Sequence, residues 1–306
     1  MSDARPRNFL GLDPEDSDPR RAAVLVLPVP YEATVSYGGG TRRGPQAIID
    51  ASATVELYDE AAGDEPYRIG VATAEPVPLS VAGPETAHQE LRKAYAAALR
   101  PGRFVVMLGG EHSVSAAPIL EHAARLKRQG RRLSVLQLDA HGDLRQSWEG
   151  SRWSHACAMR RVVDRVDLVQ VGIRAIAVEE RAVMRRHGVT TVFAHEMQDG
   201  EGWIDRAVAA LGRDVYVTID IDYFDPSLVP STGTPEPGGG TWYPTLRLLE
   251  RVFRTRHVVA ADVVELAPIP GLPAPDFLAA KLVYTLIGFH ARSRRGRGSR
   301  RTARRG

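Results

Sequence analysis

Cysteine is almost absent from this 306-residue chain, which contains only Cys157. A single cysteine excludes an intrachain disulfide and any metal site built from several thiolates, and it makes the cytoplasm the default location. Long apolar runs are also missing, because no segment reaches the roughly 18 apolar residues of a transmembrane helix. Residues 1–7 are followed by no apolar core of the kind that a secretory signal needs. The sequence therefore predicts a cytoplasmic globular protein with no membrane partner.

Acidic residues are missing from the C-terminal segment 291–306, which contains eight arginines. Because the whole chain has a formal net charge of +3, residues 1–290 carry −5. An acidic body weakly favours the approach of cationic small molecules. The segment 291–306 has no apolar periodicity, so we expect a disordered tail, either simply solvated or in weak, salt-sensitive contact with RNA or another polyanion.

Strand-like and helix-like segments alternate along residues 22–290, and we expect residues 1–290 to form a single domain. Apolar runs typical of strands lie at 22–29, 104–108, 133–138, 168–171, 189–193, 215–219 and 257–264. Helical patterns lie at 45–58, 84–99, 204–211, 243–254 and 275–287. This alternation predicts an α/β fold, a mostly parallel sheet with helices on both faces. Such sheets bind ligands outside the carboxyl ends of their strands.

Histidines and aspartates directly follow three of the predicted strands. They are His112 after the first, Asp139, His141 and Asp143 after the second, and Asp220 and Asp222 after the third. Residues i and i+2 of a strand point the same way, so each cluster can face one place. An Asp-x-Asp pair alone is common, but burying four carboxylates without cations would cost too much. We therefore expect two divalent cations such as Mn²⁺ at one edge of the sheet.

Together with their neighbours, these clusters resemble the motifs of the ureohydrolases, the arginase and agmatinase family, and the resemblance covers nearly all of residues 22–290. The matching segments are Gly109-Gly110-Glu111-His112-Ser113, Asp139-Ala140-His141-Gly142-Asp143, Ser154-His155, Asp220-Ile221-Asp222, Gly233-Thr234-Pro235-Glu236-Pro237-Gly238 and Asp262-Val263-Val264-Glu265. The resemblance is closest to the agmatinase-like branch. It implies a three-layer domain around a roughly eight-stranded sheet and a homo-oligomer, a trimer or a hexamer.

The same resemblance implies a binuclear manganese site. One ion would be bound by His112 and Asp143, the other by His141 and Asp222, and both would be bridged by Asp139 and Asp220. Glu111, which stands where many relatives have aspartate, would orient His112.

The reaction implied by the resemblance is hydrolysis of a guanidino group to urea and an amine. The guanidinium carbon is a poor electrophile, and two metal ions would supply a strong nucleophile by lowering the pKa of water. Asp143 or Asp222 would relay the proton that this water loses. His155 would shuttle protons at the entrance of the site, and Glu265 would pair with the guanidinium group of a small cationic substrate.

The substrate is less closely defined by the sequence. Residues 144–153 lack the Asn/Thr/Ser-rich loop of arginases, which favours agmatine, cleaved to putrescine and urea in polyamine biosynthesis. Many agmatinases have Ser-His-Gly-Thr where this chain has Ser-His-Ala-Cys at 154–157, so N1-aminopropylagmatine is the main alternative. Guanidinobutyrate and formiminoglutamate follow. A family member that binds metal without catalysis, with a polyanion-binding tail, is the alternative from another class.

Three further features are expected near the site. Trp148 and Trp153 could line its entrance or simply pack. The glycine-rich segment 37–45 lacks the spacing of phosphate-binding loops and is expected near the mouth of the site or at a subunit contact. The glycine- and proline-rich segment 232–240 is expected beside the ligand. No Cys-His-Asp arrangement accompanies Cys157, which argues against a catalytic thiol.

Overall fold

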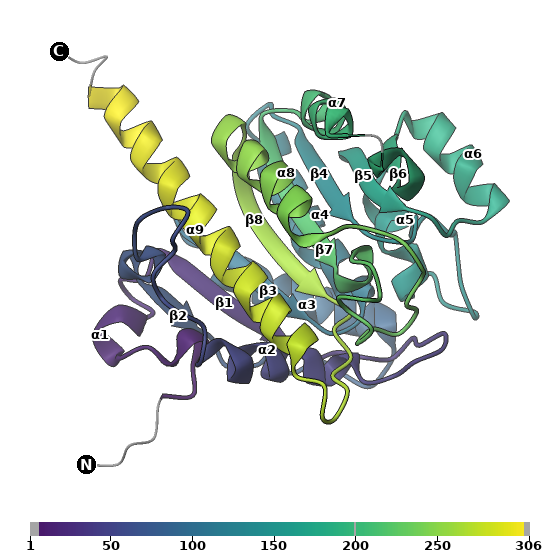
Figure 1. Cartoon of the computed structure of the whole chain (residues 1–306). Helices are drawn as coiled ribbons and strands as arrows, with labels where there is room; N and C mark the ends of the chain where they lie inside the picture. The colour runs from purple at the N-terminus through teal and green to yellow at the C-terminus, as the bar shows by residue number, and fades with distance from the viewer. Residues whose placement is uncertain (1–5, 199, 303–306) are drawn as a thin grey trace.

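A computed structural model describes residues 6–198 and 200–302, with side chains as far as Arg295, and its eight strands form one parallel sheet (Figure 1). The strands are β1 (Val24–Val29), β2 (Val71–Thr73), β3 (Phe104–Gly109), β4 (Leu133–Leu138), β5 (Asp167–Ile173), β6 (Thr190–Phe193), β7 (Asp214–Asp220) and β8 (His257–Val264). The predicted α/β architecture is confirmed. The sheet order is β2-β1-β3-β8-β7-β4-β5-β6, so the strands from β3 to β4 occupy the centre.

Helices cover both faces of the sheet, which explains why β1, β3, β4 and β7 are buried along their whole length. One face is packed by α2 (Gly44–Ser52), α7 (Gly202–Ala210), α8 (Trp242–Thr255) and α9 (Ala274–Thr302). The other is packed by α3 (Pro84–Ala98), α4 (Ala116–Lys127), α5 (Ala158–Val162) and α6 (Val178–His187). Figure 1 shows α8 and α9 in front of the sheet and α3 and α4 behind it.

Short helical segments complete the chain. They are α1 (Pro14–Ser17) and the 3-10 helices η1 (Phe9–Gly11), η2 (Thr41–Arg43), η3 (Pro66–Ile69), η4 (His112–Ser115), η5 (His155–Cys157), η6 (Ala194–Met197) and η7 (Ile221–Tyr223). Two of them, η4 and η7, start within three residues of the ends of β3 and β7. A turn of 3-10 helix redirects the chain immediately beyond a strand, so residues on these turns stay close to the carboxyl edge of the sheet.

The C-terminal segment differs from the expected disordered tail. Helix α9 continues to Thr302, so residues 291–302 are helical, whereas residues 303–306 lie outside the described part of the chain. Ala291 is buried, and the guanidinium groups of Arg292 and Arg295 form ion pairs with Asp59 and Asp64. Composition alone missed these contacts because their acidic partners lie more than 200 residues earlier in the sequence.

Two other elements also differ from the sequence-based expectation. The helix predicted at 45–58 ends at Ser52, and the three-residue edge strand β2 was not predicted, since so short a run has no readable periodicity. Among the described residues, no helix is long and apolar enough to cross a membrane.

Candidate metal centre

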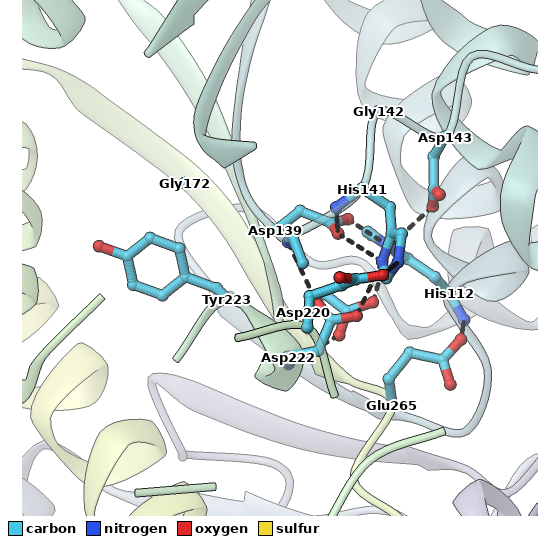
Figure 2. A network of polar contacts seen from close by, with 12 residues as sticks. His112, Asp139, His141, Gly142, Asp143, Gly172, Asp220, Asp222, Tyr223 and Glu265 are labelled. Carbon is cyan, nitrogen blue, oxygen red and sulfur yellow. Dashed lines mark hydrogen bonds and ion pairs between the residues drawn. The ribbon is translucent and has the colours of Figure 1, made fainter. Parts of the chain in front are cut away.

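The carboxyl ends of the four central strands meet at one site (Figure 2). Its predicted residues come from η4 after β3, from residues 139–143 after β4, from the end of β7 with η7, and from the residue directly after β8. They are His112, Asp139, His141, Asp143, Asp220, Asp222 and Glu265. The sheet order makes β3, β8, β7 and β4 neighbours, so segments far apart in sequence deliver their side chains to one place.

The first group of possible ligands surrounds the imidazole of His112. Its Nδ1 atom lies 3.0 Å from Asp139 Oδ2, 3.0 Å from Asp143 Oδ2 and 3.2 Å from Asp220 Oδ2. All four side chains are buried, and His112 Nδ1 has no properly oriented hydrogen-bond partner among the described residues. A buried nitrogen that faces three carboxylates without a hydrogen bond is what a cation site between them requires.

The second group surrounds His141. Its Nδ1 atom lies 2.9 Å from Asp222 Oδ2 and 3.7 Å from Asp139 Oδ1. Asp139 therefore belongs to both groups, one with His112 and Asp220 and the other with His141 and Asp222, and each group could hold a metal ion. This placement fits the bridging position expected for Asp139.

The orientation of His112 is set by residues that the sequence did not single out. Thr218 Oγ1 donates to Asp262 Oδ1 at 2.6 Å, so it faces His112 Nε2, 2.9 Å away, as an acceptor. Nε2 must then carry a proton, so Nδ1, which faces the three carboxylates, is the nitrogen whose lone pair a metal ion could use. Gln137 plays a similar part for Asp139, since its Nε2 atom donates to Asp139 Oδ2 at 2.7 Å.

Crowding of carboxylates in the interior shifts their titration. Burial raises the pKa of Asp220 well above its ordinary value, and the charges of Asp222 and Asp139 add to the effect. Burial, with the charge of Asp139, likewise raises the pKa of Asp143 to about 7. Without metal ions, bound protons therefore neutralise part of the negative charge of the cluster. Two divalent ions would neutralise the same charge in their place. The donor set of imidazoles and carboxylates fits them.

Backbone strain is concentrated at the same edge of the sheet. Asp143 and Glu265 have φ values of 52° and 64°, in the left-handed region that non-glycine residues rarely adopt. Strain of this kind persists where the surrounding structure fixes a residue for function. The backbone is also closely packed at Gly110, where a side chain would overlap the carbonyl oxygen of Tyr31.

A cavity of about 340 Å³ opens above the two groups. Besides the ligands, it is lined by Glu265, Glu236, His155 and Trp148, and by backbone from both glycine-rich segments, which meet where Gly38 N donates to Gly233 O at 3.0 Å. Residues of both segments therefore border the cavity. Glu265 Oε1 accepts from the backbone N–H of His112 at 2.5 Å, and burial raises the pKa of this carboxyl well above its ordinary value.

One expectation for a neighbouring residue was wrong, and the two tryptophans divide between the two alternatives that the sequence left open. Among the described residues, the carboxylate of Glu111 accepts hydrogen bonds from the backbone of Ala33 and Thr34 and from the hydroxyls of Thr34 and Ser113, and not from the ring of His112. Trp148 lines the cavity, whereas Trp153 stacks on His88 with ring centroids 4.0 Å apart, outside it.

Cys157 behaves as the sequence suggests. Its side chain is fully buried, its Sγ atom donates to Ser151 O at 3.9 Å, and burial raises the pKa of the thiol to about 11. A protonated, enclosed thiol is a poor nucleophile, so the cysteine packs rather than reacts.

Comparison with known proteins places this geometry in a class. The arginase family profile matches residues 22–288, so the chain belongs to the arginase family. It is an enzyme that hydrolyses the C–N bond of a guanidino group, a ureohydrolase.

Individual relatives cover almost the whole chain. The N(1)-aminopropylagmatine ureohydrolase of Synechocystis sp. is 40% identical over 281 residues, 90% of this chain and 91% of that protein. The agmatinase of Pyrococcus horikoshii is 32% identical, over 90% of this chain and 94% of that protein. The solved structure of proclavaminate amidino hydrolase from Streptomyces clavuligerus superposes with a TM-score of 0.85 at 30% identity, covering 95% of this chain and 98% of that one.

Proposed function

We propose that this enzyme is a manganese-dependent ureohydrolase that converts N1-aminopropylagmatine to spermidine and urea, with agmatine as the second candidate substrate. The main observation behind this proposal is the position of Glu265, whose carboxylate lines the cavity beside both groups of possible metal ligands. The 40% identity to a relative of that name over 281 residues supports the longer substrate. The sequence alone favoured agmatine, which the 32% identity to an agmatinase supports less strongly.

Substrate binding follows from the charge of the cavity. Within the described part of the chain, the hydrogen bond to Glu265 is the one from the N–H of His112 to Oε1, so Oε2 can accept from a guanidinium N–H. A guanidinium ion keeps Glu265 ionised in spite of its burial. Glu236 lies at the same cavity, with its Oε1 atom 4.0 Å from His141 Nε2 and its side chain 40% exposed, so it can receive an ammonium group of the substrate tail.

Two Mn²⁺ ions held by His112, Asp143, His141, Asp222, Asp139 and Asp220 would supply Lewis acidity, which lowers the pKa of water at the site. A carboxylate oxygen that accepts no hydrogen bond from the backbone can take the proton that the attacking water loses. Asp143 and Asp222 are the expected acceptors. A bond forms between the water oxygen and the guanidinium carbon, and the C–N bond to the amine breaks. His155 then donates a proton to the departing amine nitrogen.

The test is urea release by protein reconstituted with Mn²⁺, with N1-aminopropylagmatine, agmatine, arginine and 4-guanidinobutyrate compared at equal concentrations. We expect kcat/KM to be about tenfold or more higher for N1-aminopropylagmatine than for agmatine, the discrimination that one added binding group gives. The reverse ratio would make agmatine the substrate. Release from neither would overturn the proposal, and Glu265→Gln serves as the inactive control with both metal ions retained.

A further inference from the structure

His155 is held between two hydroxyl groups that come from one distant loop. Thr34 Oγ1 lies 3.2 Å from its Nδ1 atom, and Ser36 Oγ lies 3.0 Å from its Nε2 atom. The backbone N–H of His155 also donates to Thr34 Oγ1 at 3.0 Å. Both ring nitrogens are therefore partnered, and the partners lie 119 and 121 residues earlier in the chain.

Glu111 fixes this loop from below. Its buried carboxylate accepts from the backbone N–H of Ala33 and of Thr34, both at 2.6 Å. It also accepts from the hydroxyls of Thr34 at 2.8 Å and of Ser113 at 2.5 Å. Four donors converge on one carboxylate, so the position of Thr34 relative to His155 is set rigidly.

Counting protons assigns the tautomer of His155. The single hydroxyl proton of Thr34 is used toward Glu111, because a carboxylate can only accept. Thr34 Oγ1 therefore faces His155 as an acceptor, and Nδ1 must carry the proton. Ser154 Oγ, 3.4 Å from the same nitrogen, can accept from it as well. Burial lowers the pKa of His155, which keeps the ring neutral and leaves Nε2 with a lone pair.

Ser36 is placed to exchange protons with that lone pair. Trp148 Nε1 donates to Ser36 Oγ at 3.0 Å, which leaves the hydroxyl proton of Ser36 free to point at His155 Nε2. Ser36 is exposed, so its oxygen can take a proton from solvent as it gives one to the ring. The hydrogen bonds run in one direction, from the indole through Ser36 to His155, Thr34 and Glu111.

We propose that Ser36 relays protons between solvent and His155 Nε2, and that Thr34 and Glu111 are positioning residues that hold His155 in the Nδ1–H tautomer. The proposal rests on the proposed function, in which His155 protonates the departing amine. Ser36 donates its hydroxyl proton to the Nε2 lone pair of neutral His155 and receives one from water, and Nε2–H then gives its proton to the departing amine, which returns the ring to the neutral Nδ1–H form. The proton that Asp143 or Asp222 takes from the attacking water is released to solvent, so the protein neither gains nor loses a proton over a turnover.

Kinetics of Ser36→Ala with and without His155 test the relay. In the enzyme loaded with Mn²⁺, Ser36→Ala should lower kcat about tenfold, a part of the effect of a general acid, and leave KM nearly unchanged. Added imidazole buffer should restore kcat, because it delivers protons in place of the hydroxyl. In the His155→Ala background, Ser36→Ala should have no further effect. An equal loss in both backgrounds, or no rescue by buffer, would overturn the relay.

The role of Thr34 has its own matched pair of variants. Thr34→Val removes the hydroxyl and should lower kcat and displace the acidic limb of the pH profile, whereas Thr34→Ser should recover most of the kcat. Nitrogen-15 spectra of histidine-labelled protein loaded with Zn²⁺ give a readout that needs no turnover. They should show His155 as the Nδ1–H tautomer, lost in Thr34→Val. An Nε2–H tautomer in the unsubstituted protein would overturn the assignment, whether or not that protein releases urea.

Discussion

Asp214 and Asp220 stand at opposite ends of β7, and both side chains are buried, yet their surroundings differ completely. Asp214 Oδ2 accepts from Arg131 Nε at 2.9 Å, and Oδ1 accepts from a second nitrogen of the same guanidinium group. His257 Nδ1 lies 2.7 Å from Oδ1 on the other side. The charge of Asp214 is therefore neutralised within the protein by the guanidinium group of Arg131.

Asp220 has no counterion of its own. Within the described part of the chain its one ion-pair partner is His112, which is also shared by Asp139 and Asp143. A buried carboxylate with its own arginine belongs to the structure, whereas a buried carboxylate that shares one imidazole with two others requires a cation from outside. The difference identifies the functional end of the strand without reference to any relative.

The largest effect is expected from Asp220→Asn. It removes a proposed bridging ligand, so we expect urea release to fall by about 10³-fold, equivalent to about 4 kcal/mol of transition-state stabilisation, and the metal content to drop below two ions per chain. With chelator present, the variant should be as stable as the unsubstituted protein or more stable, because repulsion among the carboxylates is relieved. If the metal-free variant has a lower Tm than the metal-free unsubstituted protein, Asp220 stabilises the fold as Asp214 does, and the contrast between the two ends of β7 is wrong.

Asp214→Asn should give the opposite result. Loss of the carboxylate leaves the guanidinium of Arg131 without its partner, which we expect to cost about 3 kcal/mol of the free energy of unfolding, the lower end for a buried pair because Arg131 is partly exposed. Activity per folded molecule should not change. Urea denaturation and kcat measured on the same preparation decide the matter, and a stable variant with low kcat would contradict the structural role.

His88 represents a third kind of buried titratable group. Neither ring nitrogen has a hydrogen-bond partner among the described residues, and burial lowers its pKa from 6.5 to about 4. Because the unfolded state binds the proton more readily, the stability from neutral His88 is complete above pH 6.5 and is lost as the pH falls toward 4. The loss is at most about 3 kcal/mol. His88→Phe, which keeps the stack on Trp153, should flatten the dependence of Tm on pH in this window; an unchanged slope would assign it to other groups.

The smallest expected effect is the dependence of the Mn²⁺ affinity on pH. Without metal, burial raises the pKa of Asp143 to about 7, so binding near or below this pH must displace a proton. We expect Mn²⁺ affinity to weaken about tenfold for each pH unit below 7 per proton displaced. Calorimetry in buffers of different ionisation enthalpy counts the protons released. If the Mn²⁺ affinity stays constant between pH 6 and 8, the carboxylates are already ionised before the metal binds, and the predicted proton release is wrong.

The sequence predicted the central strands well because they are continuous buried apolar runs. The ranges for β4 and β8 agree with the structure to the residue. It failed where structure depends on distant partners, as in residues 291–302, whose helix is joined to Asp59 and Asp64. It also missed β2, whose three residues pair with β1 at the sheet edge.

The candidate site divides in the same way. Residues with metal-ligand chemistry at strand ends were visible because their spacing and type are unusual for a soluble surface. Thr218, Thr34 and Ser36 were invisible, since a hydroxyl has no sequence signature and its role depends on what lies within 3 Å. Glu111 was assigned to its chain neighbour, His112, although its hydrogen bonds go to a loop 77 residues away.

The sequence by itself determined the alternation of strands and helices, the choice of candidate metal ligands and their location at strand ends, because these follow from local periodicity and residue chemistry. Only the tertiary structure decided which ends meet, since the order β3-β8-β7-β4 is not written along the chain. It also decided which buried carboxylates have a counterion and which hydroxyl groups face the ring nitrogens of His112 and His155. Those properties depend on distances between groups that the sequence separates, and electrostatic and hydrogen-bond energies are functions of distance.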